Sequence, residues 1–321
     1  MAFYNEPLVQ VFEDTQRFYT ENPTLAAAVE ASRRNTKLYG ADDYPALQND
    51  PHQNNDPTQH NDSTQRNDLA QRNTPTQLNN PTQPSAPTQR KQEVRVTKHK
   101  TFEAAMALHK EFPDKKIAVL NFASAMRPGG GVKKGARAQE ESLCRCSTLF
   151  PTIDRRWLWN EYYDVNRAAK DVRHSDACIY SPGVIICKTD ESIPKRMPES
   201  EFVTVDVISC AAPDLKKKPY NRYNPETGRA INVDNKELYD IHLKRAKHIL
   251  HIAAANRVDI LVLGAFGCGA FHNDPEVVAE ACKDAILDDQ YKDKFDLIEF
   301  AIYCKATETR NYEAFNRRIG S

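Results

Sequence analysis

The chain has 321 residues, and its 44 Lys and Arg balance its 44 Asp and Glu, so the formal net charge is zero. A neutral chain offers no strong overall field to nucleic acid or to an anionic membrane, and no apolar run approaches the roughly 20 residues that span a bilayer. The first residues lack the pattern of a secretory signal. We therefore expect an intracellular monomer, cytoplasmic or nuclear, with no membrane partner and no direct nucleic-acid partner.

The eight cysteines fall mostly within apolar patterns, and none forms a C-x-x-C pair. This usage is typical of reduced core cysteines in a cytosolic or nuclear protein. Cys144 and Cys146 could hold half of a metal site, but no second half with suitable spacing follows. The sequence therefore predicts no metal.

The N-terminal segment, residues 1–40, is expected to be helical and to pack on the body of the protein. A helical pattern covers residues 12–39, and Pro23 after Asn22 marks the start of a second helix. Gly40 suits the C-cap of that helix.

A low-complexity insertion follows at residues 41–92. Residues 49–90 are seven tandem hexapeptides with Gln at the fifth place of every copy and no aromatic residue. Such a composition cannot bury enough apolar surface to offset chain entropy, and it has no apolar face with which to stack as a solenoid. The sequence predicts a disordered insertion, and a tether that binds a partner is the alternative.

Beyond the insertion, short apolar strands alternate with helices. The pattern predicts strands near 94–96, 117–120, 177–187, 202–210, 259–263 and 297–303. It predicts helices near 102–108, 139–149, 154–172, 234–255 and 274–290. This alternation is typical of an α/β sheet with helices on its faces, here one domain over residues 93–321.

One glycine cluster follows the apolar run at 260–263. Gly264, Gly267 and Gly269 lead into a helix that begins near Asn273 or Asp274. A strand, a glycine loop and a helix N-terminus together bind phosphate through backbone N–H groups. The spacing fits neither the Walker loop nor the dinucleotide fingerprint. A tight turn is the simpler reading, but three glycines in six residues exceed what a turn needs, so diphosphate binding is favoured.

The other cluster follows the run at 117–120. Asn121 closes that run, residues 129–131 are three consecutive glycines, and Gln139, Glu140 and Glu141 follow. Acidic residues in a first helical turn complement the helix dipole, which alone explains most Glu-Glu pairs. Because a glycine loop lies close in the sequence, a role of Glu140 and Glu141 in a functional site competes with this structural explanation.

These residues carry a resemblance. Residues 129–131, a spacer of seven residues and then 139–141 resemble the signature of poly(ADP-ribose) glycohydrolases. Residues 120–124 and 264–271 resemble the bacterial-type, or microbial, branch in particular. The likeness runs from about residue 93 to 305, with the helix at 24–39 as its N-terminal piece, and the repeat tract departs from it.

The resemblance implies a macrodomain-like three-layer sandwich, a mixed sheet between helical layers, with an ADP-ribose cleft. It implies hydrolysis of the ribose–ribose bonds of poly(ADP-ribose), with that polymer and ADP-ribosylated proteins as partners and with no metal or dissociable cofactor. Glu141 maps to the catalytic acid, while Glu140 and Asn121 map to groups that orient ribose hydroxyls. The implied substrate-binding set is Asn121, Gly129, Gly130, Gly131, Gln139, Gly264, Ala265, Phe266, Gly267, Cys268, Gly269, Ala270 and Phe271.

Within this set, the loop at 129–131 would lie along the distal sugar, the loop at 264–271 would cradle the diphosphate, and Phe271 would pack on the adjacent ribose. Adjacent Cα atoms are about 3.8 Å apart and their side chains need not point together. The sequence therefore does not show that two carboxylates flank one glycosidic bond. A mechanism in which one Glu serves first as acid and then as base fits better.

Alternative functions remain open at this point. A related hydrolase could remove single ADP-ribose groups, a non-catalytic macrodomain could read ADP-ribose, and an inactive scaffold could present the repeats. The intact 139–141 triplet argues against the last two. The adenine pocket is open as well: Tyr180 and Phe202 are candidates or core residues, and Tyr220, Arg222 and Tyr223 lie in a polar loop that could border the cleft.

Overall fold

The computed structural model describes residues 4–47, 91–216 and 233–320. The hexapeptide tract at 49–90 lies outside the described residues, and so do Tyr220, Arg222 and Tyr223. The expectations placed on those segments therefore stay expectations.

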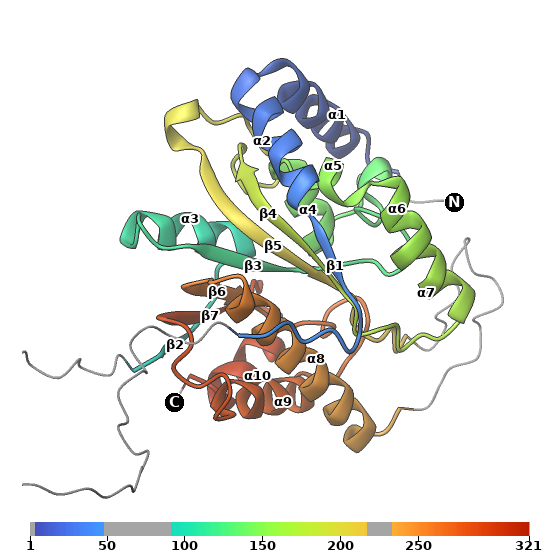
Figure 1. The fold of residues 1–321 in the computed structure, drawn as a ribbon, viewed down its shortest axis with the longest axis vertical. Coiled ribbons are helices and arrows are strands. Elements are labelled where there is room, and N and C mark those ends of the chain that lie inside the picture. Colours follow the sequence, from blue (N-terminus) through green and yellow to red (C-terminus); the bar gives the residue numbers. More distant parts are fainter. Residues whose placement is uncertain (1–3, 48–90, 217–232, 321) are drawn as a thin grey trace, which may run out of the picture.

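A seven-stranded sheet forms the middle layer, in the order β1-β4-β5-β3-β6-β7-β2 (Figure 1). Its strands are β1 Lys37–Tyr39, β2 Glu93–Thr97, β3 Ile117–Phe122, β4 Cys178–Ile186, β5 Val203–Cys210, β6 Ile260–Leu263 and β7 Leu297–Ala301. The pairs from β5 to β2 are parallel, whereas β4 pairs antiparallel with both β5 and β1. The sheet is thus mixed, and the predicted α/β class is confirmed.

Helices cover both faces of the sheet (Figure 1). One layer holds α1 Glu6–Glu21, α2 Pro23–Asn35, α3 Thr101–Glu111, α4 Gln139–Cys146 and α5 Phe150–Ile153. The opposite layer holds α8 Asn235–Ala255, α9 Pro275–Leu287 and α10 Arg310–Arg318. Phe102 and Phe150 belong to the core under the first layer, and Val278 and Phe315 belong to the core under the second. The predicted three-layer arrangement is therefore confirmed.

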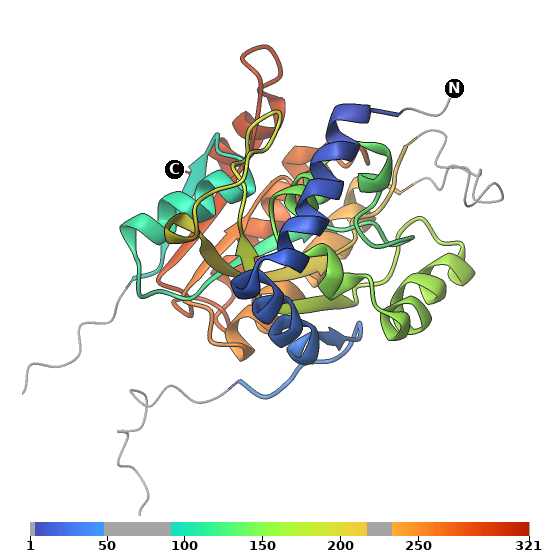
Figure 2. The ribbon, with the colours of Figure 1, turned by 90° about the horizontal axis from the view of Figure 1, so that it is seen from above.

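The N-terminal helices differ in detail from the prediction. The chain is helical from Glu6, and residues 37–39 form a strand instead of a helical end, so Gly40 follows β1 and caps no helix. The second helix starts as expected, with Asn22 Oδ1 accepting from Leu25 N–H at 3.0 Å. Figure 2 looks down on α1 and α2 (blue), which lie side by side over the body. Lys188, 1% exposed, fixes α1 by donating to Val11 O at 3.0 Å and by pairing with Asp14 at 2.8 Å.

The helix expected over 154–172 is present over residues 156–169, and a π-helical turn interrupts its regular hydrogen bonding. After α5 come α6 Arg156–Leu158, a π-helical turn at Trp159–Tyr163 and α7 Asp164–Ala169. The helix expected over 139–149 ends at Cys146, because Ser147 leaves the helix to pair with Ile186 of β4. Tertiary pairing thus overrides the local pattern here.

Two further observations concern the whole described chain. Seven of the eight cysteines are buried and all eight are free, as the pattern predicted. Among residues 4–47, 91–216 and 233–320, no helix combines the length and apolar character needed to cross a bilayer.

Candidate active site

The two glycine clusters meet at one edge of the sheet. β3 and β6 are parallel neighbours, so the loops that follow them leave the sheet side by side. We call residues 129–131 the first glycine loop and residues 264–271 the second glycine loop. Two adjoining cavities open there, a larger one of about 640 Å³ and a smaller one of about 360 Å³. Phe122, Ala138, Ala270 and Phe271 line both cavities, so the two form one continuous cleft.

Gln139 fastens the start of α4 to the end of β3. Its Oε1 accepts from Phe122 N–H at 2.9 Å, and its Nε2 donates to Leu120 O at 2.7 Å and to Thr101 Oγ1 at 3.0 Å. Although Gln139 lines the larger cavity, both ends of its amide are bonded to protein. Its geometry is that of a group that places the next two residues.

Glu140 is held by backbone donors on both sides. It is 3% exposed, and its two oxygens accept from Ser124 N–H at 2.8 Å and Gly129 N–H at 3.1 Å. Burial, with a smaller contribution from the neighbouring charge of Glu141, raises the pKa of Glu140 to about 8, against the opposing donors of Ser124, Asn121 and Gly129. Burial therefore favours the protonated form of this carboxyl, and the backbone donors oppose it.

Glu141 lies under the first glycine loop and lines the smaller cavity. Its Oε1 accepts from Gly131 N–H at 2.7 Å, while its Oε2 is buried and makes no hydrogen bond to any residue that the structure describes. The loop can approach this closely because it is made of glycine: a Cβ at Gly130 would lie 2.5 Å from Oε1, and its φ is +51°. One carboxyl oxygen is thus fixed by the loop, and the other has no described partner, although protein covers it.

Asn121, fully buried at the end of β3, stands behind the two glutamates. Its Nδ2 donates to Ser209 Oγ on β5 at 2.9 Å, and its Oδ1 has no partner in the described part of the chain. The bond to β5 fixes the amide, so Asn121 can orient Glu140 from behind.

The second glycine loop is supported from α8. Asn273 N–H donates to Gly267 O at 3.1 Å, and the Asn273 side chain donates to the backbone oxygens of Pro213 and Phe271. Its Oδ1 lies 2.7 Å from Nε2 of His242, which is buried on α8. Burial lowers the pKa of His242 to about 4, so a neutral imidazole bonds Asn273. Asp274 caps α9 as predicted, by accepting from Glu276 N–H at 2.9 Å.

The predicted substrate-binding residues fall into two groups. Those that line a cavity are Gly130, Gly131, Gln139, Ala265, Phe266, Gly267, Gly269, Ala270 and Phe271. Those that lie behind the lining are Asn121, Gly129, Gly264 and Cys268. Cys268 turns its side chain into the core, with Sγ 3.6 Å from Phe266 O. A contact of the second group with substrate stays a prediction.

Sequence reasoning missed the far end of the larger cavity. Lys100, Asp190 and Tyr303 line it, and they come from three separate segments that share no motif. Lys100 Nζ lies 5.7 Å from the Tyr303 ring centroid and donates to the Asp190 backbone oxygen. Among the described residues, Tyr303 is one of the few large aromatic side chains exposed to solvent, a signal that only the structure supplies.

Of the two aromatic candidates for an adenine pocket, Tyr180 is a core residue and Phe202 is partly buried against a small cluster around Leu25. Tyr180 is buried and donates to the Asp206 carboxylate. Phe202 packs edge-on against Phe18, with ring centroids 6.0 Å apart. Neither residue lines the cleft.

Within the described ranges, His, Cys, Asp and Glu side chains form no group of three that could hold a metal ion. Cys144 and Cys146, the pair with a metal-like spacing, are both buried in the core under the first helical layer. The polar groups that line the cleft include backbone N–H donors, carboxyls, amides and basic side chains, among them Lys100, Arg137 and Lys216, which together suit a hydroxylated and phosphorylated ligand.

Glu140 predicts a pH dependence of stability. Because its folded pKa, about 8, lies above its ordinary value of 4.5, its contribution to stability is fully present below pH 4.5 and is lost as the pH rises through 8. We expect the free energy of unfolding of the wild type, minus that of Glu140→Gln, to fall across this window and to level off above it. Urea unfolding of both proteins between pH 4.5 and 9 measures this difference. A difference that does not change with pH would contradict the raised pKa of Glu140.

The chain matches a family model described as the catalytic domain of microbial-type PARG, where PARG is poly(ADP-ribose) glycohydrolase, over residues 10–189. It is similar to the solved PARG of Thermomonospora curvata bound to the inhibitor ADP-HPD, at 26% identity with 98% of this chain and 100% of that chain covered and a TM-score of 0.72. It is also similar to the PARG of Deinococcus radiodurans in complex with ADP-ribose, at 28% identity, 91% and 96% coverage and a TM-score of 0.66. No curated protein matches.

Proposed function

The chain belongs to the microbial-type poly(ADP-ribose) glycohydrolase family, and we propose that its cleft hydrolyses the ribose–ribose O-glycosidic bonds of poly(ADP-ribose) with Glu141 as the acid. One observation carries the residue assignment. Glu141 has one oxygen bonded to the first glycine loop and the other without a described partner, at the wall of a cavity that adjoins the second glycine loop. A non-catalytic reader of ADP-ribose would have no need of this arrangement.

Glu141 would donate a proton from Oε2 to the ribose oxygen that leaves, because Oε1 already accepts from Gly131 N–H. Cleavage then passes through an oxocarbenium-like ribose, and the resulting carboxylate takes a proton from the attacking water. Oε2 is covered by protein in the structure, so substrate entry has to displace part of that cover. Glu140 has both oxygens engaged by backbone N–H groups, which suits it to orientation.

The two cavities accommodate different parts of ADP-ribose in this proposal. The distal ribose lies in the smaller cavity beside Glu141, and the diphosphate lies on the second glycine loop, which lines both cavities. The adenosine then occupies the larger cavity, whose lining includes the exposed ring of Tyr303 and the largely buried carboxylate of Asp190, which already accepts from Ser142 Oγ at 3.0 Å. Aromatic rings bind purines by stacking, and a carboxylate accepts from an exocyclic amine.

Gly269 tests the diphosphate assignment. A Cβ at Gly269 would meet no protein atom within 4 Å, because this glycine faces the larger cavity. Gly269→Val should therefore fold normally and fill ligand space, and a clash of about 1–3 kcal/mol would weaken ADP-ribose binding roughly 5- to 150-fold. Calorimetry with ADP-ribose measures the loss. An unchanged affinity would remove the second glycine loop from the binding site.

Gly267 provides the contrast. Its φ is +80°, and a Cβ would lie 2.8 Å from the Ala212 side chain and 2.9 Å from Asn273. Gly267→Val should therefore lose stability as well as affinity, which its melting temperature would report.

The overall function is tested with purified protein and two substrates. We expect release of ADP-ribose from poly(ADP-ribose), followed by chromatography. A mono-ADP-ribosylated protein is the comparison, because it lacks the ribose–ribose bond. Release from the second substrate alone would replace the proposal with a mono-ADP-ribosyl hydrolase, and release from neither would reject both.

A further inference from the structure

His174 lines the smaller cavity together with Glu140 and Glu141, and it does not line the larger one. Its Nδ1 is buried and has no hydrogen-bond partner among the described residues. Nε2 of the same ring is not among the buried atoms that lack a partner, and it makes no hydrogen bond to a described residue. The ring belongs to the wall of the cavity in which the distal ribose is proposed to lie, so Nε2 is available to a ligand.

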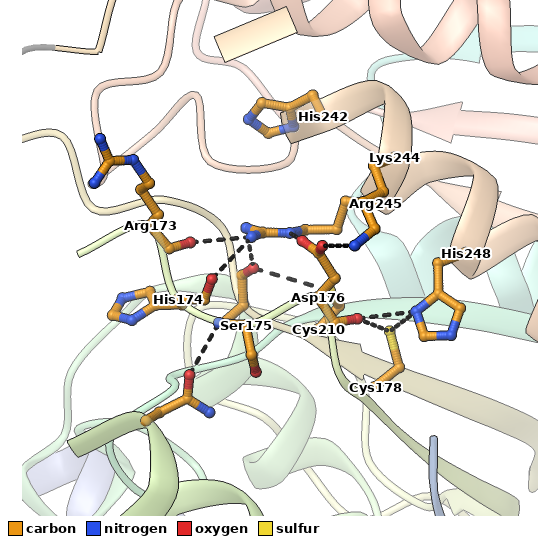
Figure 3. Close-up of polar contacts among 12 residues, drawn as sticks. Arg173, His174, Ser175, Asp176, Cys178, Cys210, His242, Lys244, Arg245 and His248 are labelled. Atoms are coloured by element: carbon orange, nitrogen blue, oxygen red, sulfur yellow. Dashed lines mark hydrogen bonds and ion pairs between the residues drawn. The ribbon is translucent and has the colours of Figure 1, made fainter. Parts of the chain in front are cut away.

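The backbone of His174 is held in place by Arg245 of α8 (Figure 3). Arg245 is 1% exposed, and its Nη2 donates to the backbone oxygens of Arg173 at 3.0 Å and His174 at 3.2 Å. Its Nη1 donates to Ala211 O at 2.8 Å, just beyond β5. The same guanidinium binds Asp176 Oδ1 at 2.8 Å. These bonds fix the loop that carries His174 to the sheet and to α8.

His174 adopts φ +59°, a conformation that few residues other than glycine, Asn, Asp and His adopt readily. Five described residues other than glycine have a positive φ, and two of them are histidines, His174 and His272, both at +59°. His272 is exposed and lines neither cavity. The two histidines thus have the same backbone conformation but different surroundings.

The imidazole of His174 is neutral at physiological pH. Burial, with the charge of Arg245 as the second cause, lowers the pKa of His174 to about 4, and Asp171 in the same loop opposes the shift only in part. The other ionisable groups around the same cavity are Arg127 after β3, Glu140 and Glu141 of α4, Lys170 and Asp171 after α7, and Asp214 and Lys216 after β5. A neutral imidazole has one donor and one acceptor nitrogen.

We propose that His174 is a substrate-contacting residue, in which Nε2 forms a hydrogen bond with a hydroxyl group of the ribose next to the bond that is cut. A hydroxyl both donates and accepts, so it pairs with either tautomer of the ring. His174 shares the smaller cavity with Glu140 and Glu141, and its ring lies 6.5 Å from that of Phe271, the residue expected to pack on a ribose, so we assign the contact to the ribose. This inference rests on the proposed function of the same cleft.

Binding of ADP-ribose and of ADP to His174→Asn tests the contact. ADP carries the diphosphate but lacks the distal ribose. Asn tolerates a positive φ, so the substitution removes the imidazole without forcing the backbone, and His272→Asn is the matched control. One neutral hydrogen bond corresponds to roughly a 2- to 10-fold change in affinity. We expect the Kd of ADP-ribose to rise by this factor in His174→Asn alone, with the Kd of ADP unchanged and KM for poly(ADP-ribose) raised.

Two results would overturn the inference. An unchanged Kd for ADP-ribose would remove the contact, and an equal rise for ADP and ADP-ribose would place it at the diphosphate or show a disturbed cleft. If His174→Asn does not fold, His174→Gln and His272→Gln are compared in the same way. Failure of the proposed function is a separate result: the wild type would release no ADP-ribose from the polymer, whereas the comparison of the two ligands would still report on His174.

Discussion

We expect Glu141→Gln to lower kcat by roughly 100- to 10,000-fold, the usual contribution of a general acid, while ADP-ribose still binds. Gln keeps the size of the side chain and an oxygen that can accept from Gly131 N–H at the 2.7 Å site of Oε1. It cannot deliver a proton to the leaving ribose. Initial rates on poly(ADP-ribose), with calorimetry for ADP-ribose, separate the loss of chemistry from a loss of binding.

The simpler reading of Glu141 as a first-turn residue that complements the helix dipole predicts a different result. It predicts a loss of stability under about 1 kcal/mol and near-normal activity. Glu313 in the first turn of α10 is the matched control, because it is exposed and lines neither cavity. Glu313→Gln should keep full activity. If Glu141→Gln behaved like Glu313→Gln, the mechanism proposed for this cleft would be wrong.

Glu140→Gln should also impair turnover, but through geometry. Its carboxyl bridges Ser124 N–H and Gly129 N–H, and an amide group can accept with only one of its two ends. The segment that follows β3 and the first glycine loop would then lose part of their common anchor. A ribose placed less accurately reacts more slowly.

The sheet could be predicted from the sequence because its strands are short apolar runs. Every residue of β6 and β7 is buried, and strands covered on both faces are typically continuous apolar runs. The same logic misses β1, whose three residues are too few to show a period. It also misses α10, where the only buried side chains are Ala314 and Phe315.

The candidate site could be predicted only where the functional residues are clustered along the chain. The two glycine loops and the 139–141 triplet are local patterns, and the cleft forms where they meet. The anchoring role of Gln139 depends on Thr101, 38 positions away, and no local pattern indicates such a bond. His174 and Tyr303 are single residues in irregular segments, which the fold alone brings to the cleft.

The largest loss of stability is expected at Arg245, and Arg245→Met tests it. The substitution removes the donors of three backbone oxygens and leaves the Asp176 carboxylate without its buried partner. Breaking a buried ion pair in this way costs about 3–5 kcal/mol, a large part of the roughly 5–15 kcal/mol that keeps a domain folded. Urea unfolding at pH 7 measures the difference from the wild type.

Lys244, the preceding residue of α8, is the matched control for Arg245. It pairs with the same Asp176 at 3.2 Å, but its side chain is 48% exposed, and in the part of the chain that the structure describes its partners are the carboxylates of Asp42 and Asp176. Exposed pairs contribute about 0–1 kcal/mol, so Lys244→Met should unfold almost as the wild type does. Equal midpoints for the two variants would show that the charge of Asp176, and not the three backbone oxygens, accounts for the stability. If only Arg245→Met unfolds at a lower urea concentration, the hydrogen bonds from α8 to the backbone stabilise the cleft wall. The affinity of this variant for ADP-ribose should then fall together with its stability.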